Sequence, residues 1–594
     1  MQRDVSILAL HVSVIITRRR SLAQLDGRRY QLPTARLWMG AADRLCSTIG
    51  TVHQRRGVVN SDVQSNLQAD ETERDRPWLA AAIVLAALAV SMTLAAVSRG
   101  CHHDDDLTHY LFARWAWIWP QYLLHEWGRP GFTILHFLPA RFGWLASRCM
   151  SGVLSAATAW LAYCIARRQK LPYPWLVPVL VFAQPMFLTL SYTTLTETAL
   201  AFYIAAAAYL LLVGSPVASA AVLSLGLTAR YEAVVLLPIW LVVLWRCKRR
   251  WLALALLLWA PLIQNALAPS LLEQSPVMKF LEPKPLVGYG RGYWTTFLVK
   301  TLIAFGPAVM CLAVAGARSV WRRPLGRLTV ACCLGYLATQ TILRASGSYG
   351  SGGYARFLVP ISPLVGILAC AGLGELLAAP RRRAAMAVLT FGLTMLVLEG
   401  SAEWELRAAD VYWLGRETWV LRFTTLGVVL LCGTALALAR RGQTPWWRWL
   451  VPATAAIMMT VQLGGQIRPM HLKRDQLAMY KTTQWLHEQG LTRRPIVVAN
   501  LWFEHFLGRA RSPKLRLFCH DVAKAPPGAI IAWDKRYGPQ VGSGLPLSAL
   551  QDHPSKYKLL YRSPSTRHDG VFVYVFEKLG RPPASTCPTD ASKI

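Results

Sequence analysis

Acidic residues are scarce in this sequence, and the cysteine patterns that bind metals are missing. The 594 residues include 31 Asp and Glu against 64 Lys and Arg, which gives a formal net charge of +33. The twelve cysteines are scattered, with no Cys-x-x-Cys pair and no zinc-ligand spacing, so we interpret them as small apolar side chains. No RNA- or DNA-binding motif accompanies the positive charge, which argues against a nucleic-acid partner.

Long apolar runs are abundant instead. The chain is 54% hydrophobic and its mean hydropathy is +0.31. Runs of about 17–22 residues recur from Trp78 to about Gln462, and this is the length that an α-helix needs to cross a bilayer. The sequence therefore predicts a polytopic α-helical membrane protein.

About thirteen membrane spans are expected over residues 78–466. They lie at about 78–97, 147–166, 174–191, 197–213, 216–229, 232–247, 251–268, 298–316, 327–343, 357–378, 384–399, 419–439 and 447–464. Two of them, 216–229 and 232–247, are short enough to be re-entrant. The polar, Arg-rich residues 1–77 are expected to form a disordered cytoplasmic tail.

The basic residues between the spans indicate an orientation. They cluster at residues 167–170, 246–250, 318–327, 381–383 and 440–441. If the N-terminal tail is cytoplasmic, every cluster falls on the cytoplasmic side, as the positive-inside rule requires. The loop at 98–146 then faces outward, and its polar, Pro-broken sequence favours one or two helices along the membrane surface. The Arg-heavy composition favours a bacterial plasma membrane.

The composition changes at about His471. Strand-like runs appear at 495–499, 529–533 and 571–576, after a helical stretch at 476–489. This pattern predicts a small external α/β domain over 471–594. Its 19 Lys and Arg against 9 Asp and Glu suit contact with anionic headgroups or an anionic acceptor, although a solvated stabilising domain fits equally well.

A short polar stretch with three consecutive aspartates follows the first span. Each charge near hydrocarbon costs free energy, so Asp104, Asp105 and Asp106 are functional candidates. Asp104 or Asp105 can cap a helix that begins near Asp106. On that helix Asp105 and His109 share one face, and Asp106 and Tyr110 share the next. The alternative is a solvated acidic loop that only caps a helix.

Further polar residues gather at the outward ends of other spans under this topology. They are Glu197, Arg230, Glu232, Arg291, Arg344, Tyr354 and Arg356. Each alone is explained as a snorkelling or capping side chain. Because they lie on the same side of the membrane as the aspartates, we expect these residues to form one site. Carboxylates and arginines at a membrane surface suit a reaction on a phosphate-bearing lipid.

Several motifs, in a fixed order, carry a resemblance to a known family. They are the acidic pair and His-Tyr at 105–110, the run 127–139, Thr196-Glu197, the run 229–232, and 353–363 with its Arg-aromatic-Leu…Pro…Pro pattern. The sequence resembles the GT-C superfamily of polytopic glycosyltransferases, and within it bacterial relatives of the protein O-mannosyltransferase and aminoarabinose transferase families. The likeness covers most of residues 78–380. Asp stands at the second acidic position, where the family often has Glu, and an extra Asp precedes the pair.

The resemblance implies a membrane glycosyltransferase. Such an enzyme moves a mannose-type hexose, or a similar sugar such as a pentose, from a polyprenyl-phosphate donor to an acceptor hydroxyl on a protein, lipid or polysaccharide. The transfer needs a base for the acceptor proton and cations for the donor phosphate. A single base acting in a direct displacement predicts inversion at the anomeric carbon.

Roles for individual residues follow from this chemistry. Asp105 is the first candidate base, with Asp106 and then Asp104 behind it, and we expect like-charged neighbours and partial burial to raise its pKa. Arg356 is the first candidate for the phosphate, by bidentate donation. Arg230 and Arg344 come next for that role, and His109, Tyr110, Glu197, Glu232, Arg291 and Tyr354 are supporting candidates.

Other interpretations stay open. The aspartates with His102, His103 and His109 offer oxygen and nitrogen ligands for a divalent cation. A ligase or polymerase of lipid-linked glycans differs from the first reading only in using a diphosphate-linked donor. A secondary transporter needs charges near the bilayer midplane and often repeated halves, and the sequence has neither feature. A scaffold without catalysis predicts that all three aspartates tolerate replacement by Asn.

Overall fold

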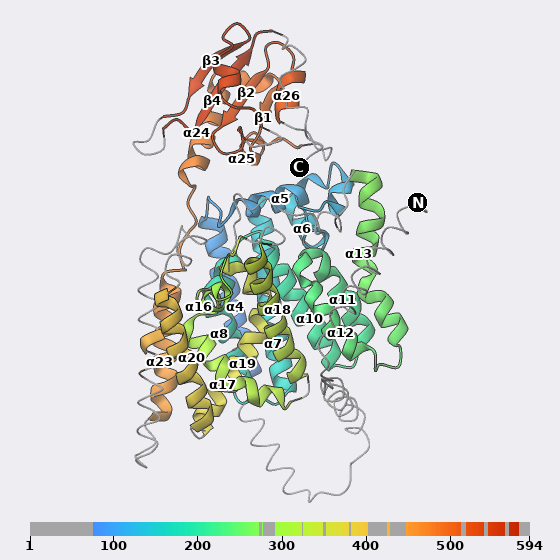
Figure 1. Ribbon diagram of the computed structural model, residues 1–594, viewed down its shortest axis with the longest axis vertical. Helices are drawn as coiled ribbons and strands as arrows, with labels where there is room; N and C mark the ends of the chain where they lie inside the picture. The colour runs from blue at the N-terminus through green and yellow to red at the C-terminus, as the bar shows by residue number, and fades with distance from the viewer. Residues whose placement is uncertain are drawn as a thin grey trace, which may run out of the picture. The chain divides into compact units, whose positions relative to one another are not determined.

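The computed structural model describes most of the chain from residue 75 onward (Figure 1). The described residues are 75–272, 276, 292–323, 325–347, 352–378, 382–401, 425–427, 430, 447–511, 518–539, 544–564 and 570–580. Nearly all of the expected N-terminal tail, most of the expected span 419–439 and Arg291 lie outside them.

The described residues from 77 to 464 form a helical bundle. Its main helices are α4 (Pro77–Val97), α7 (Trp144–Arg168), α10 (Thr196–Leu212), α11 (Pro216–Ala229), α12 (Leu236–Leu244), α13 (Arg250–Leu272), α16 (Thr296–Phe305), α17 (Pro307–Trp321), α18 (Gly326–Ser346), α19 (Ser362–Ala378), α20 (Arg382–Ser401) and α23 (Trp447–Gly464). Short 3₁₀ segments join some of them: η3 (Tyr231–Val235) precedes α12, and η5 (Ala355–Ile361) runs into α19.

Within the described residues, five helices are long and apolar enough to cross a membrane, or six if the bent pair α16 and α17 counts as one span. They are α4, α7, α13, α18 and the continuous η5–α19. Five shorter apolar helices of 10–17 residues accompany them. A helical membrane protein is therefore present, and the count of thirteen spans stays a prediction.

Two expected spans are broken, so their prediction as continuous helices is wrong. The run 174–191 divides into η2 (Pro174–Leu176), α8 (Val177–Phe182) and α9 (Pro185–Leu190), where Pro185 lacks the N–H that would continue the helix. The run 298–316 bends by 108° between α16 and α17. Gly306 at this break has φ +84, a backbone conformation that favours glycine.

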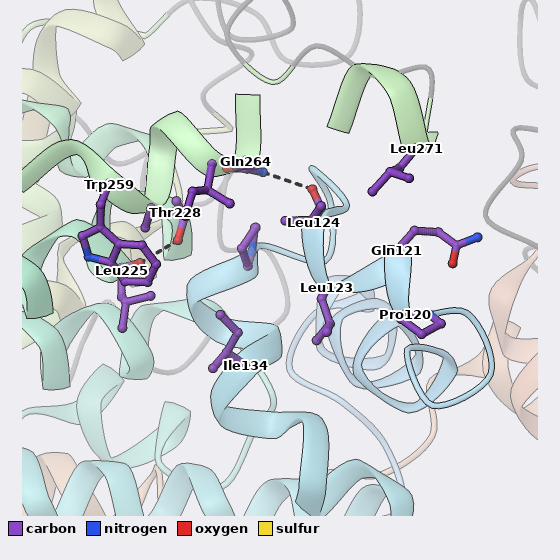
Figure 2. Close-up of a pocket in the computed structure, with 13 residues that line it drawn as sticks. Pro120, Gln121, Leu123, Leu124, Ile134, Leu225, Thr228, Trp259, Gln264 and Leu271 are labelled. Carbon is purple, nitrogen blue, oxygen red and sulfur yellow. Dashed lines mark hydrogen bonds between the residues drawn. The ribbon is translucent and has the colours of Figure 1, made fainter. Parts of the chain in front are cut away.

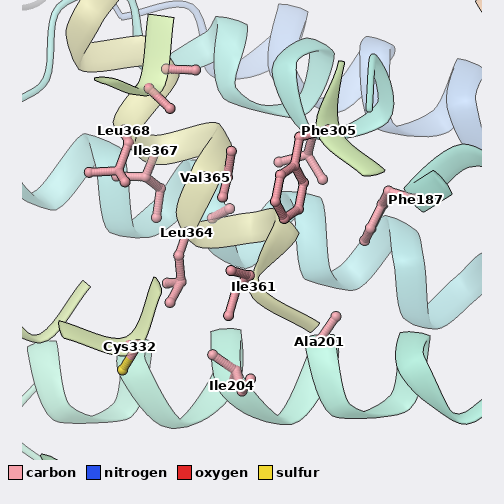
Figure 3. Packing of buried hydrophobic residues seen from close by; sticks show 14 of the residues in the cluster. Phe187, Ala201, Ile204, Phe305, Cys332, Ile361, Leu364, Val365, Ile367 and Leu368 are labelled. Carbon is pink, nitrogen blue, oxygen red and sulfur yellow. The ribbon is translucent and has the colours of Figure 1, made fainter. Parts of the chain in front are cut away.

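The bundle is centred on a large apolar core (Figure 3). Side chains from α9, α10, α16, α18 and α19 meet there. Helices α17 and α19 pack closely, because Gly316 and Gly372 let the two backbones approach. A Cβ at Gly316 would overlap the carbonyl oxygen of Leu368, and one at Gly372 would overlap that of Leu312. Small residues at helix crossings are the usual means of close packing in membrane proteins.

The loop between α4 and α7 is helical, as expected. It contains α5 (Asp104–Trp115), η1 (Pro120–Leu124) and α6 (Pro130–Arg141). The expected cap is wrong, because α5 begins at Asp104 and its N-cap is His103. All three aspartates therefore lie in the first turn, where they complement the positive end of the helix dipole.

Residues 474–578 form a mixed α/β segment. Its elements are α24 (Arg474–Glu488), η6 (Leu491–Arg493), β1 (Ile496–Val498), α25 (Leu501–Phe506), α26 (Phe518–Lys524), β2 (Ile530–Asp534), α27 (Ser548–Gln551), β3 (Tyr557–Arg562) and β4 (Val573–Lys578). The sheet order is β1-β2-β4-β3, with β1 parallel to β2 and the other pairs antiparallel. The expected helix and three expected strands are present. The sequence analysis missed β3, an edge strand with Lys and Arg among its apolar residues.

Candidate active site

An ion pair joins the first turn of α5 to η5. The Nη2 atom of Arg356 lies 2.7 Å from Oδ2 of Asp105, and its Nη1 atom lies 3.6 Å from Oε1 of Glu197. The Asp105 side chain is 29% exposed, whereas Arg356 is buried and Glu197, in the first turn of α10, is fully buried. Asp105 is therefore the solvent-facing end of this contact.

The pairing continues through Arg230 at the end of α11. Its Nη1 atom lies 2.8 Å from Oε1 of Glu197, and its Nη2 atom lies 2.8 Å from Oε1 of Glu232 in η3. Phe357 packs under both guanidinium groups, with its ring centroid 4.7 Å from Arg230 and 5.3 Å from Arg356. We call the five charged residues the ion-pair chain: Asp105, Arg356, Glu197, Arg230 and Glu232. The sequence analysis had proposed all five, and the fold brings them together.

The charges around Asp105 set its protonation. Burial alone raises the pKa of a carboxyl group, but the hydrogen bond from His103, whose Nδ1 lies 3.1 Å from Oδ2, and the charge of Arg356 outweigh burial and hold the pKa of Asp105 well below its usual range. The expectation of a raised pKa is wrong. The neighbouring aspartates turn toward other partners, while the guanidinium of Arg356 faces Asp105, so this carboxylate is ionised at neutral pH.

Asp106 is a buried structural link. It accepts the backbone N–H of Thr194 at 2.7 Å and also the Thr194 hydroxyl, and its second oxygen lies 3.7 Å from Arg148 of α7. Its side chain has no exposed surface. Asp106 therefore fastens α5 to α7 and to the residues before α10, and an acceptor hydroxyl cannot reach it in this arrangement.

Asp104 faces the α/β segment. It accepts hydrogen bonds from Gln476 Nε2 and Trp502 Nε1, both at 3.2 Å, and it pairs with Arg536. The first two partners are 372 and 398 residues away in the chain, so no local sequence pattern could have identified them. The sequence analysis also missed Arg148, the charged partner of Asp106, because no local sequence pattern links these two residues.

Two supporting candidates lie beside Asp105. His109 is buried, and its Nδ1 lies 2.8 Å from the carbonyl oxygen of Trp127. Burial lowers the pKa of His109 to about 3, so its ring is neutral at pH 7. The ring of Tyr354 meets that of His103 edge-on at 5.2 Å.

In the part of the chain that the structure describes, no group of three or more His, Cys, Asp or Glu could hold a metal ion.

Three other candidates from the sequence analysis are not part of the ion-pair chain. Tyr110 stacks on Trp144 within the apolar core that α5 shares with the α/β segment. Arg344, near the end of α18, packs closely against Gly353. Arg291 lies outside the described residues.

The sequence analysis also missed a buried lysine. Lys300 of α16 has no exposed surface, and its Nζ donates to the carbonyl oxygen of Gly353. This contact fixes the residues immediately before Arg356.

A cavity of about 380 Å³ lies between η1, α6, α11 and α13 (Figure 2). Its walls are almost entirely apolar, and they include Leu123, Ile134 and Trp259. Gln264 at its edge donates to the carbonyl oxygen of Leu124 at 3.3 Å. Thr228, also in the wall, is two residues from Arg230 of the ion-pair chain.

Two solved structures of ArnT from Cupriavidus metallidurans have a similar fold. The apo structure matches with 14% identity and a TM-score of 0.53, over 84% of this chain and 98% of that chain. The structure bound to undecaprenyl phosphate matches with 14% identity and a TM-score of 0.54, over 86% and 99%. The chain has the fold of ArnT. No protein-family model matches the sequence, and no curated protein matches it.

The likeness to ArnT agrees with the helical membrane fold that the resemblance of the sequence motifs implied. At 14% identity it establishes the fold, and the ArnT fold together with the apolar helices makes this chain an integral membrane protein.

Proposed function

We propose that this protein is a membrane glycosyltransferase that takes a sugar from a polyprenyl-phosphate donor. The observation that carries the proposal is the contact between Asp105, a partly exposed and ionised carboxylate, and Arg356, a buried guanidinium of the ion-pair chain. A base and a phosphate-binding cation are the two groups that such a transfer needs. The ArnT fold supports the donor class, because one of the two ArnT structures is bound to undecaprenyl phosphate.

Donor binding would rearrange the contact at Arg356. This guanidinium already faces Asp105 and Glu197, so a phosphate reaches it by replacing one of the two carboxylates. Asp105 is the one that moves, because it is 29% exposed while Glu197 is fully buried. The phosphate then occupies Arg356 and leaves the Asp105 carboxylate free for the acceptor.

The transfer is a direct displacement. The acceptor oxygen attacks the anomeric carbon as the bond between that carbon and the phosphate oxygen breaks, and the lipid phosphate leaves as an anion held by Arg356. The acceptor proton passes to the Asp105 carboxylate, and the anomeric configuration inverts. Asp105 needs only to accept this proton, because the phosphate is already a good leaving group.

The remaining assignments belong to the same proposal. The apolar cavity beside α13 offers a site for part of the lipid tail, since its wall approaches the ion-pair chain at Thr228. From the charge asymmetry we infer an active site on the outer face of the membrane, which we take to be a bacterial plasma membrane, with residues 78–466 as the transmembrane domain and 471–594 as an external domain. The sugar is a mannose-type hexose or a similar hexose or pentose.

Sugar transfer by the purified protein in lipid nanodiscs tests the proposal. A panel of radiolabelled polyprenyl-phosphate sugars is offered with protein, lipid and polysaccharide acceptors, and Asp105→Asn serves as the control. We expect transfer from at least one donor and its loss in the variant with donor binding retained. If the folded protein transferred only from diphosphate-linked glycans, the glycan ligase would replace this proposal.

A further inference from the structure

We propose that the α/β segment holds the catalytic helix α5 through Asp104, which makes Asp104 a positioning residue for Asp105. The inference rests on the proposed function for the role of Asp105, and on the contacts of the described residues for the attachment itself.

Three donors from three separate parts of the α/β segment converge on the Asp104 carboxylate. They are Gln476 of α24, Trp502 of α25 and Arg536, which follows β2. Arg536 also lies 3.5 Å from Asp475. A carboxylate that merely begins a helix needs only the N–H groups of its own first turn, so three distant donors indicate a built attachment.

The chain just before α5 is also paired with the residues just before the α/β segment. The N–H groups of Arg99 and Gly100 both donate to the carbonyl oxygen of Met470, at 2.9 and 2.8 Å, and Met470 N–H donates to Ser98 Oγ at 2.9 Å. A Cβ at Gly100 would overlap the carbonyl oxygen of His471, so the two strands of chain lie in close contact. This pairing fixes the approach to α5 on the same side as the Asp104 contacts.

A rigid turn presents Arg536. Asp534 is fully buried, and its Oδ1 accepts the N–H groups of Arg536 at 3.1 Å and Tyr537 at 2.9 Å. Gly538 closes the turn by donating to the Asp534 carbonyl oxygen at 2.9 Å, with no room for a Cβ. Arg536 therefore reaches Asp104 from a backbone that has little freedom to move.

The consequence concerns Asp105, the next residue along the helix. Asp104 and Asp106 are fastened on two sides of the first turn, one to the α/β segment and one to α7, and Asp105 faces Arg356 between them. Loss of one attachment lets the first turn shift. A misplacement of about 1 Å at a catalytic group lowers a rate by up to about 100-fold.

The test measures transfer by Asp104→Asn, Arg536→Gln and Arg536→Lys in nanodiscs. Arg494→Gln is the matched control, because Arg494 is 46% exposed against 44% for Arg536 and pairs with Glu577 at 2.7 Å inside the α/β segment. We expect Asp104→Asn and Arg536→Gln each to lower kcat about tenfold with the donor KM within about twofold of wild type. Arg536→Lys should keep most of the activity, the double variant Asp104→Asn/Arg536→Gln should be no worse than the single variants, and Arg494→Gln should match the wild type.

A readout without activity separates this inference from the proposed function. Hydrogen exchange over residues 101–110 of the full-length protein should become faster in Arg536→Gln and stay unchanged in Arg494→Gln. Wild-type activity and unchanged exchange in Arg536→Gln would overturn the inference. Faster exchange in Arg536→Gln, in a wild type that transfers no sugar from any donor, would refute the proposed function and leave the attachment supported.

Discussion

At the scale of single residues, three consecutive aspartates have different surroundings, and for Asp105 and Asp106 this predicts two different phenotypes. Asp105→Asn should lower transfer about 10²–10⁴-fold, because it removes a base, and should cost less stability than Asp106→Asn, because Arg356 keeps Glu197 as a counter-charge. Asp106→Asn should instead cost about 3 kcal/mol of folding stability, because Arg148 then loses its buried counter-charge. Thermal unfolding alongside the transfer assay distinguishes the two. Equal losses of activity at equal stability would contradict the assignment.

Arg356 allows a second prediction at this scale. Its guanidinium spans Asp105 and Glu197, and a lysine ammonium cannot make the same two contacts. Arg356→Lys should therefore weaken donor binding about 10–100-fold, the range for one lost hydrogen bond to a charged group. Binding is measured by titration with a polyprenyl-phosphate sugar. Arg344→Lys is the comparison. If Arg344→Lys weakens donor binding more than Arg356→Lys does, the ranking of Arg356 above Arg344 as the phosphate-binding residue is wrong.

At the scale of elements, the crossing of α17 and α19 gives the clearest prediction. The added methyl group in Gly316→Ala would meet backbone atoms of α19, which cannot rotate away as a side chain does. We expect a cost of about 1–3 kcal/mol, typical of overpacking. Gly335→Ala in α18 is the control, because its Cβ meets only side-chain atoms at 3.5 Å or more, and its effect should stay within about 1 kcal/mol. Unfolding temperatures in detergent compare the two variants.

The sequence predicted the helices and strands better than it predicted the breaks and contacts between them. Long apolar runs such as α4 and α7 were located because length and hydropathy alone define them. The 108° bend between α16 and α17 was missed, because an apolar run looks the same whether it is straight or broken at Gly306. The arginines and glutamates at the ends of the apolar runs were found because charge is rare there. The roles of Asp104 and Asp106 were not, because Trp502 and Thr194 lie far away in the chain.

At the scale of the whole molecule, one polar site depends on segments from most of the chain. The ion-pair chain draws on α5, α10, α11, η3 and η5, and the attachments of α5 reach Arg536, which follows β2. A site of this kind has no local sequence signature beyond scattered charged residues. The ion-pair chain lies within the bundle, and only the contacts of Asp104 require the α/β segment to be folded as well.

The histidines around the site predict how stability of the whole protein depends on pH. Burial lowers the pKa of His109 and His136 to about 3 and that of His125 to about 4. The unfolded chain therefore binds more protons than the folded one below about pH 6.5. The stability contribution of each histidine is complete above that pH and is lost as the pH falls toward 4, by up to about 1.4 kcal/mol per pH unit for each. Unfolding temperatures measured from pH 7 to 4.5 should decline from about pH 6.5, and His136→Gln should decline less steeply than exposed His520→Gln. Identical slopes in the two variants would show that His136 takes up its proton in the folded protein.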